Sequence, residues 1–129
     1  MSLTAAESLE IIQLVTRADD CATARDADAY VELFTEDGTM TGAIGSAHGR
    51  ADLRQAVTAV WAAEPAATLH LTLNATIDES DPAGPCVTSI LLTVAGGPEA
   101  KPLTSARIRQ VVRRTPDGWR IASREIDTS

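Results

Sequence analysis

Few side chains in this 129-residue sequence can carry acid–base chemistry in a buried site. His70 lies in an alternating run over residues 69–74, which predicts a β-strand whose one face also carries Thr72 and Asn74. Asp19 lies in a helical pattern, at the margin of its apolar stripe. Because an imidazole held by a carboxylate can take a proton from a hydroxyl or a carbon acid, we predict His70 as a general base oriented by Asp19. The alternative is a solvated Asp19, with His70 as a hydrogen-bonded residue of a pocket wall.

Three further side chains are candidates for ligand binding. Asn74 shares the predicted strand face of His70, and Gln110 has the strand parity of Ile108, so its amide is expected to point inward and orient a carbonyl. Trp61 recurs at helical spacing with Val57, as a wall of the core or of a cavity. Each also has a structural explanation, because the amides can satisfy neighbouring polar groups and Trp61 can be a packing residue.

Motifs for cofactors, metals and nucleophiles are missing from the sequence. It has only two histidines, no His-x-x-x-His pair and no cysteine cluster, so no metal site is expected. It has no G-x-G-x-x-G, no phosphate-binding loop and no G-x-S-x-G. Any enzyme here is therefore predicted to be cofactor-independent.

Composition narrows the class of partner. The net charge of −7 and the 3% share of aromatic residues argue against nucleic acid, which needs clustered cations and stacking side chains. No apolar run approaches the roughly 18 residues of a membrane span, and the first residues lack the pattern of a signal peptide. Cys21 and Cys86 form no Cys-x-x-Cys pair, so both are expected to be reduced, buried thiols of a cytoplasmic protein.

The second half of the chain predicts one antiparallel sheet that curls over a pocket. Its strand-like runs are separated by segments rich in Gly, Pro, Asp and Ser. The predicted strands cover residues 67–78, 86–95, 103–114 and 118–126. In the first of them, one face is expected to carry Leu69, Leu71, Leu73, Ala75 and Ile77.

The first half predicts helices that cover one face of that sheet. Thr4 and Glu7 form a capping box before a helix that runs to about Ala24, and Asp26 has the position of an N-cap for a second helix at 27–34. The other elements expected are a turn at 36–38, a short strand at 39–44 and a third helix that starts after 49–50 and ends before Pro65. The order predicts an α+β fold, in a single domain over residues 1–129.

With these elements in order, the chain resembles the SnoaL-like branch of the nuclear transport factor 2-like superfamily. The motifs that carry the resemblance are residues 24–30, 33–38, 49–54, His70 with Asn74, and 114–121. The resemblance implies a strongly bent antiparallel sheet that forms a cone with three helices around an apolar pocket. It also implies a homodimer packed through the outer sheet face. Such folds include cyclases, dehydratases, isomerases and proteins that only bind ligands, so fold alone does not fix the function.

The resemblance also locates two family sites in this sequence, and neither is complete. Isomerases of this fold have a Tyr donor and an Asp base at the positions of Ala18 and Gly42, which have no such groups. Dehydratases pair a His at the position of His70 with an Asp at the position of Thr23. Thr23 lies one helical turn beyond Asp19, so we expect Thr23 beside the ligand and Asp19 reaching over it to His70.

Three functions are compatible with these residues. The first is a lyase or isomerase that acts on a small apolar carbonyl or hydroxyl compound, with His70 as general base. The second is a protein that binds a small apolar ligand without catalysis. The third is a domain whose main role is dimerisation. An imidazole in contact with a carboxylate inside a cavity favours the enzyme, and a cavity filled by side chains favours the third role.

Overall fold

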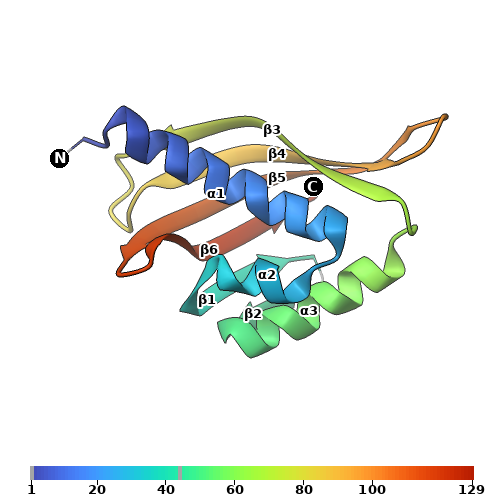
Figure 1. Ribbon diagram of the computed structural model, residues 1–129, viewed down its shortest axis with the longest axis horizontal. Helices are drawn as coiled ribbons and strands as arrows, with labels where there is room; N and C mark the ends of the chain where they lie inside the picture. Colours follow the sequence, from blue (N-terminus) through green and yellow to red (C-terminus); the bar gives the residue numbers. More distant parts are fainter. Residues whose placement is uncertain (1, 44) are drawn as a thin grey trace.

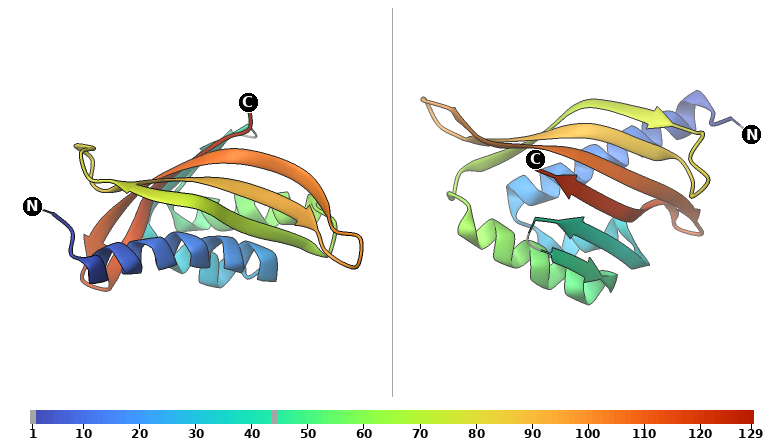
Figure 2. Two further views of the ribbon diagram at one scale, coloured as in Figure 1. Left: turned by 90° about the horizontal axis from the view of Figure 1, so that it is seen from above. Right: turned by 180° about the vertical axis from the view of Figure 1, so that it is seen from behind.

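A computed structural model describes residues 2–43 and 45–129 as a bent sheet with helices on one face (Figure 1). The helices are α1 (Ala5–Ala24), α2 (Ala27–Glu32) and α3 (Gly49–Ala63). The strands are β1 (Phe34–Gly42), β2 (Gly45–His48), β3 (Thr68–Asp78), β4 (Cys86–Ala95), β5 (Lys101–Thr115) and β6 (Gly118–Asp127). The sheet order is β2-β1-β6-β5-β4-β3. Figure 2 shows the long strands arching over the helices, which confirms the predicted α+β cone.

Local signals fix the ends of α1. Thr4 accepts a hydrogen bond from the backbone N–H of Glu7, and the Glu7 carboxylate accepts from the backbone N–H of Thr4, which is the predicted capping box. The helix ends at Arg25, whose backbone is left-handed with φ 57°. Arg25 then donates from Nη2 to the backbone carbonyls of Glu64 and Pro65, 3.1 and 2.8 Å away, so it ties the end of α1 to the end of α3.

A bulge in β3 changes which side chains face the helices. The pairing with β4 shifts between Leu73 and Thr76, and Asn74 lies there with φ 54°. Asn is one of the few residues that adopt this left-handed backbone readily. The extra residue reverses the alternation, so Ala75 and Ile77 pack against the core while the leucines before the bulge are 38–40% exposed. The prediction that all five residues share one face was therefore wrong.

The segment after α2 also differs from the prediction. Residues 36–38, expected as a turn, lie inside β1, which starts at Phe34 and pairs in parallel with β6. The pairing register shifts between Phe34 and Thr39, so the turn-forming residues mark an irregularity within the strand. Gly38 fits this close approach, because a Cβ there would lie 3.0 Å from the Phe34 side chain and would push it aside. Ile44, the end of the predicted strand, lies outside the described residues.

The core lies between the helices and the inner sheet face. Both the helices and the sheet contribute fully buried side chains to it. The side chains with 0% exposure include Ile11 and Val15 of α1, Leu53 of α3, Phe34 of β1 and Ile121 of β6. Both cysteines are free and buried, as predicted. No helix of the described residues is long and apolar enough to cross a membrane.

Candidate active site

A cavity of about 260 Å³ lies between the helices and the inner face of the sheet. Most of its wall is apolar, with Trp61 and Val57 from α3, Leu91 from β4 and Ile126 from β6. The polar or ionisable residues of the wall include Asp19, Tyr30, Glu64, His70 and Arg124. In this hollow, buried ionisable groups meet an apolar space that can hold a small molecule.

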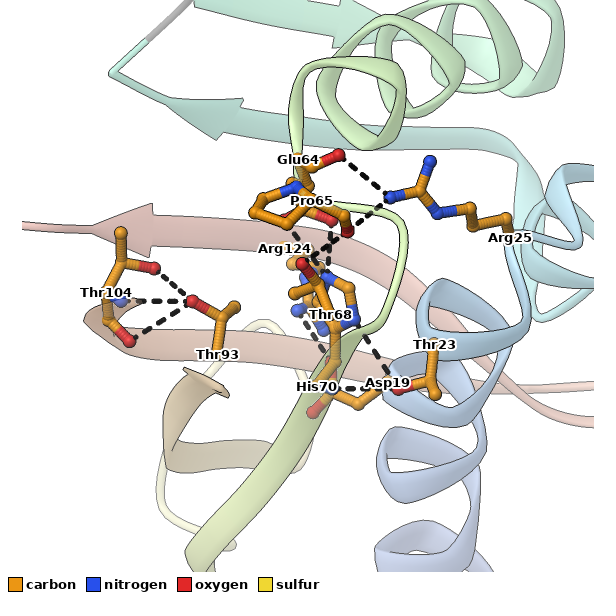
Figure 3. Close-up of polar contacts among 10 residues, drawn as sticks. All are labelled: Asp19, Thr23, Arg25, Glu64, Pro65, Thr68, His70, Thr93, Thr104 and Arg124. Atoms are coloured by element: carbon orange, nitrogen blue, oxygen red, sulfur yellow. Dashed lines mark hydrogen bonds and ion pairs between the residues drawn. The ribbon is translucent and has the colours of Figure 1, made fainter. Parts of the chain in front are cut away.

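His70 contacts a carboxylate in this cavity, but the carboxylate belongs to Glu64 (Figure 3). Its Nε2 lies 3.1 Å from Oε2 and 3.0 Å from Oε1 of Glu64. The two side chains are 4% and 20% exposed, so water screens the contact only in part. Glu64 is the residue at which α3 ends, and Arg25 holds its backbone carbonyl, so the backbone at Glu64 is held by the ends of two helices.

Thr23 holds the other side of His70. Its Oγ1 accepts a hydrogen bond of 2.8 Å from the backbone N–H of His70 and lies 3.4 Å from Nδ1 of the ring. Because Nε2 faces a carboxylate, the proton of a neutral ring belongs on Nε2, and Nδ1 then accepts from the Thr23 hydroxyl. Thr23 is thus an orienting residue for His70, and it does not line the cavity where we expected it to meet a ligand.

Asp19 forms a different ion pair from the one predicted. Its Oδ1 lies 3.0 Å from Nη2 of Arg124, and its Oδ2 accepts a hydrogen bond from the hydroxyl of Thr72. Both carboxylate oxygens of Asp19 therefore have partners, and the residue is only 3% exposed. In the part of the chain that the structure describes, Asp19 forms no hydrogen bond with the His70 ring, whose carboxylate partner is Glu64. The predicted Asp19–His70 pair is therefore wrong, because the guanidinium of Arg124 satisfies the buried carboxylate instead.

Arg124 is buried at the cavity wall, and its two terminal nitrogens have hydrogen-bond partners. Nη1 donates to Oε1 of Gln110 over 3.1 Å, and Nη2 donates to Asp19. Nε is buried and has no hydrogen-bond partner. Burial opposes the charge of this guanidinium, but the carboxylate of Asp19 beside it, and at high pH the phenolate of Tyr30, raise the pKa of Arg124, so it stays charged. Burial, with Asp19 adding to it, raises the pKa of the Tyr30 phenol, which therefore remains a neutral donor.

Of the other residues predicted to bind a ligand, Trp61 lines the cavity, whereas Gln110 and Asn74 do not. Trp61 is a cavity wall, 6% exposed, and meets the Tyr30 ring edge to face at 5.3 Å. Gln110 points inward as expected and is 1% exposed, but it holds Arg124 and does not line the cavity. Asn74 lies at the bulge of β3 beside a hollow on another part of the sheet, because the bulge removes it from the face of His70.

Two charged residues of the cavity, Glu64 and Arg124, were not predicted as site residues. Glu64 precedes the Pro65 that ends α3, a position that only indicates a helix end. Arg124 lies in a strand of mixed polarity, where arginine is normally exposed. The residues next to it in the sequence do not indicate that it is buried. Among the described residues, no group of three His, Cys, Asp or Glu gathers as a metal site would require.

Solved structures of other proteins share this fold over nearly the whole chain. A protein of unknown function with a cystatin-like fold from Nostoc punctiforme is 28% identical, with a TM-score of 0.90 over 100% of this chain and 96% of that one. An NTF2-like protein from Novosphingobium aromaticivorans is 25% identical, with a TM-score of 0.78 over 94% and 80%. A candidate scytalone dehydratase from the same organism is 18% identical, with a TM-score of 0.79 over 96% and 85%.

Three helices and a bent sheet around a cavity define the nuclear transport factor 2-like, or cystatin-like, class of proteins. Within that class, the model of the SnoaL-like domain matches residues 4–125, so the chain belongs to the SnoaL-like domain family. No curated protein matches the chain. The resemblance to the SnoaL-like branch of this superfamily is thereby confirmed.

Proposed function

We propose that this protein is a cofactor-independent lyase or isomerase for a small apolar carbonyl or hydroxyl compound, with Glu64 and His70 acting together as the general base. The observation that carries the proposal is the carboxylate–imidazole contact of 3.0–3.1 Å inside an apolar cavity. A dimerisation domain or a simple binding pocket has no need of such a pair, whereas proton abstraction does. His70 stays part of the proposed base, but the roles differ from those expected from the sequence: Glu64 takes the place of Asp19 as the carboxylate, and this carboxylate accepts the proton while His70 holds it.

The accepting atom in this proposal is Oε1 of Glu64. It is buried and accepts no hydrogen bond of good geometry, although Nε2 of His70 lies 3.0 Å away. The two nitrogens of His70 are engaged with Glu64 and Thr23, so the ring has no free lone pair toward the cavity. The imidazole therefore stabilises the carboxylate through its N–H, and in this proposal the carboxylate of Glu64 is the group that takes the proton.

The reaction balances without an added reagent. A proton leaves the carbon next to the substrate carbonyl and binds Oε1 of Glu64, while the electron pair of the C–H bond moves to the carbonyl oxygen as an enolate. Where the enolate is conjugated with a neighbouring C=C bond, return of the proton to the far carbon moves that double bond, which is an isomerisation. Loss of a hydroxyl from the neighbouring carbon, which takes the proton away as water, is a dehydration. Both reactions start with the same proton transfer, so one exchange assay detects either activity.

The test is deuterium exchange into the methyl group of acetophenone in heavy water, followed by proton NMR. The ring of this ketone suits apolar walls, and its methyl protons are acidic. We expect the protein to accelerate exchange, and Glu64→Gln to lower the enzymatic rate by about 100-fold or more, since a positioned base contributes roughly 10²–10⁴. Glu99→Gln, at an exposed carboxylate in the β4–β5 loop, is the matched control. Exchange that survives Glu64→Gln contradicts the proposal, and binding without exchange favours the non-catalytic alternative.

We also propose that the protein forms a homodimer through the outer sheet face. Leu69, Leu71 and Leu73 of β3 are 38–40% exposed and lie side by side with Leu92 of β4. Large side chains in a contiguous exposed stripe favour burial against a partner. We expect light scattering to give the mass of a dimer for the wild type and the mass of a folded monomer for Leu71→Glu. A monomeric wild type would contradict this assignment.

A further inference from the structure

Arg25 ends α1 in a backbone conformation that usually belongs to glycine. Its φ of 57° lies in the left-handed region, where the Cβ of any other residue is crowded by the backbone. Glycine is the common residue at this position after a helix because it avoids that cost. The local backbone therefore disfavours an arginine here, and its side chain has to offset that cost through its contacts.

The side chain of Arg25 crosses to the segment that links α3 to β3 (Figure 3). Its Nη2 donates to the backbone carbonyl of Glu64 over 3.1 Å and to that of Pro65 over 2.8 Å. The Pro65 carbonyl also accepts from the backbone N–H of Thr68, 3.1 Å away, and from the Thr68 hydroxyl, 2.7 Å away. A cation beside the carbonyls at the end of a helix is also favoured by the helix dipole. Arg25 and Thr68 together therefore hold the backbone of this linking segment.

The linking segment connects the two members of the carboxylate–imidazole contact. Glu64 is its first residue, and His70 lies two residues beyond Thr68 in β3. The end of α1 holds the backbone of both members. Thr23 accepts from the backbone N–H of His70 over 2.8 Å, and Arg25, two residues later, donates to the carbonyl of Glu64. The side chains of Glu64 and His70 thus meet at 3.0–3.1 Å between two backbones that are anchored to one helix end.

We propose that Arg25 is a positioning residue for the Glu64–His70 pair, because by anchoring the backbone at Glu64 it sets where the carboxylate meets the imidazole. Arg25 is exposed and lies outside the described lining of the cavity, so it acts through Glu64 and not on a ligand. The catalytic consequence rests on the proposed function, whereas the geometry of the contact does not. A base works only when it is held in the productive position, so a small displacement of Glu64 lowers the rate without a matching loss of ligand binding.

The test is nitrogen NMR of the histidine rings in Arg25→Gly, Arg25→Lys and Arg17→Met. Arg25→Gly removes both hydrogen bonds and suits the left-handed backbone, so the fold should be kept. We expect the Nε2 resonance of His70 to move in the same direction as in Glu64→Gln, because the contact with the carboxylate is loosened. The ring signals of His48, at the opposite end of α3, should stay in place. Arg25→Lys keeps a charged donor and should show a smaller movement.

Exchange kinetics with acetophenone give a second readout. Arg25→Gly should lower the maximal exchange rate about tenfold and change the half-saturating ketone concentration less than about twofold, since Arg25 acts on the position of the base alone. Arg17→Met, at an exposed position of the same helix, should match the wild type in rate and resonance. An unmoved Nε2 resonance in Arg25→Gly, an equal movement in Arg17→Met, or an unchanged rate in Arg25→Gly overturns the inference. If the wild type shows no exchange, the proposed function fails, and the resonance still decides the role of Arg25.

Discussion

Removing Arg124 alone should destabilise the fold far more than removing it together with Asp19. In Arg124→Met, the Asp19 carboxylate keeps its buried position, with a side chain only 4% exposed, and loses its ion-pair partner. Breaking a buried pair in this way costs about 3–5 kcal/mol, out of a total stability of about 5–15 kcal/mol for a domain. The hydrogen bond from Thr72 remains and keeps the cost within this range.

The double variant Asp19→Asn/Arg124→Met gives a different expectation. It replaces both charges by groups of similar volume, and replacement of a buried pair is often close to neutral. Its free energy of unfolding should lie within about 2 kcal/mol of the wild type, so the two sites should couple strongly in a double-mutant cycle. Arg54→Met is the matched control, because the Arg54–Asp28 pair is 50% and 75% exposed and surface pairs contribute about 0–1 kcal/mol.

Urea unfolding followed by tryptophan fluorescence measures five proteins: the wild type, Arg124→Met, Asp19→Asn, the double variant and the Arg54→Met control. Trp61 lines the cavity and is 6% exposed, so its emission reports unfolding of the site. If Arg124→Met costs no more than Arg54→Met, or if the double variant is as unstable as the sum of its two single changes, then Asp19 and Arg124 do not form the buried pair described above.

Two further predictions concern the bulge and the thiols. Asn74→Gly should leave the free energy of unfolding nearly unchanged, whereas Asn74→Val should lower it by about 1–2 kcal/mol, because a β-branched residue disfavours the φ of 54° at this position. Equal urea midpoints for the two variants would contradict the left-handed backbone at the bulge. Burial raises the pKa of the Cys21 and Cys86 thiols. The unfolded thiols lose their protons first, so the stability contributed by these groups is complete below the ordinary thiol pKa of about 8.5 and falls as pH rises through the higher folded values. The loss should be smaller in a Cys21→Ala/Cys86→Ala variant, and equal alkaline losses would refute it.

Much of the fold follows from local patterns. The capping box at Thr4, the N-cap at Asp26 and the alternation from Cys86 to Ala95 each depend on neighbouring residues, and each element begins where the pattern predicts. The bulge at Asn74 and the parallel pairing of β1 with β6 depend on contacts between distant segments. No periodicity within one segment can indicate them.

The site was predictable in part for the same reason. His70 was found because strand alternation places it on the inner face, and its exposed fraction of only 6% agrees with that. The carboxylate partner of His70 was not found. The sequence pointed to Asp19, one helical turn before Thr23 in α1, but Asp19 pairs with Arg124, and the partner of His70 is Glu64 at the end of α3. The partner of a buried charge is the opposite charge that the tertiary structure brings within contact distance. A sequence pattern within one segment does not contain that information.

The most direct test of the account is the position of the ring proton of His70, measured by nitrogen NMR of the imidazole at neutral pH. A ring that donates from Nε2 to Glu64 and accepts at Nδ1 from Thr23 should show a protonated Nε2 and an unprotonated Nδ1 in its neutral form. In Glu64→Gln the Nε2 resonance should move while the fold is kept. A proton on Nδ1, or an Nε2 signal unaffected by Glu64→Gln, would show that the imidazole and the carboxylate do not work as one base.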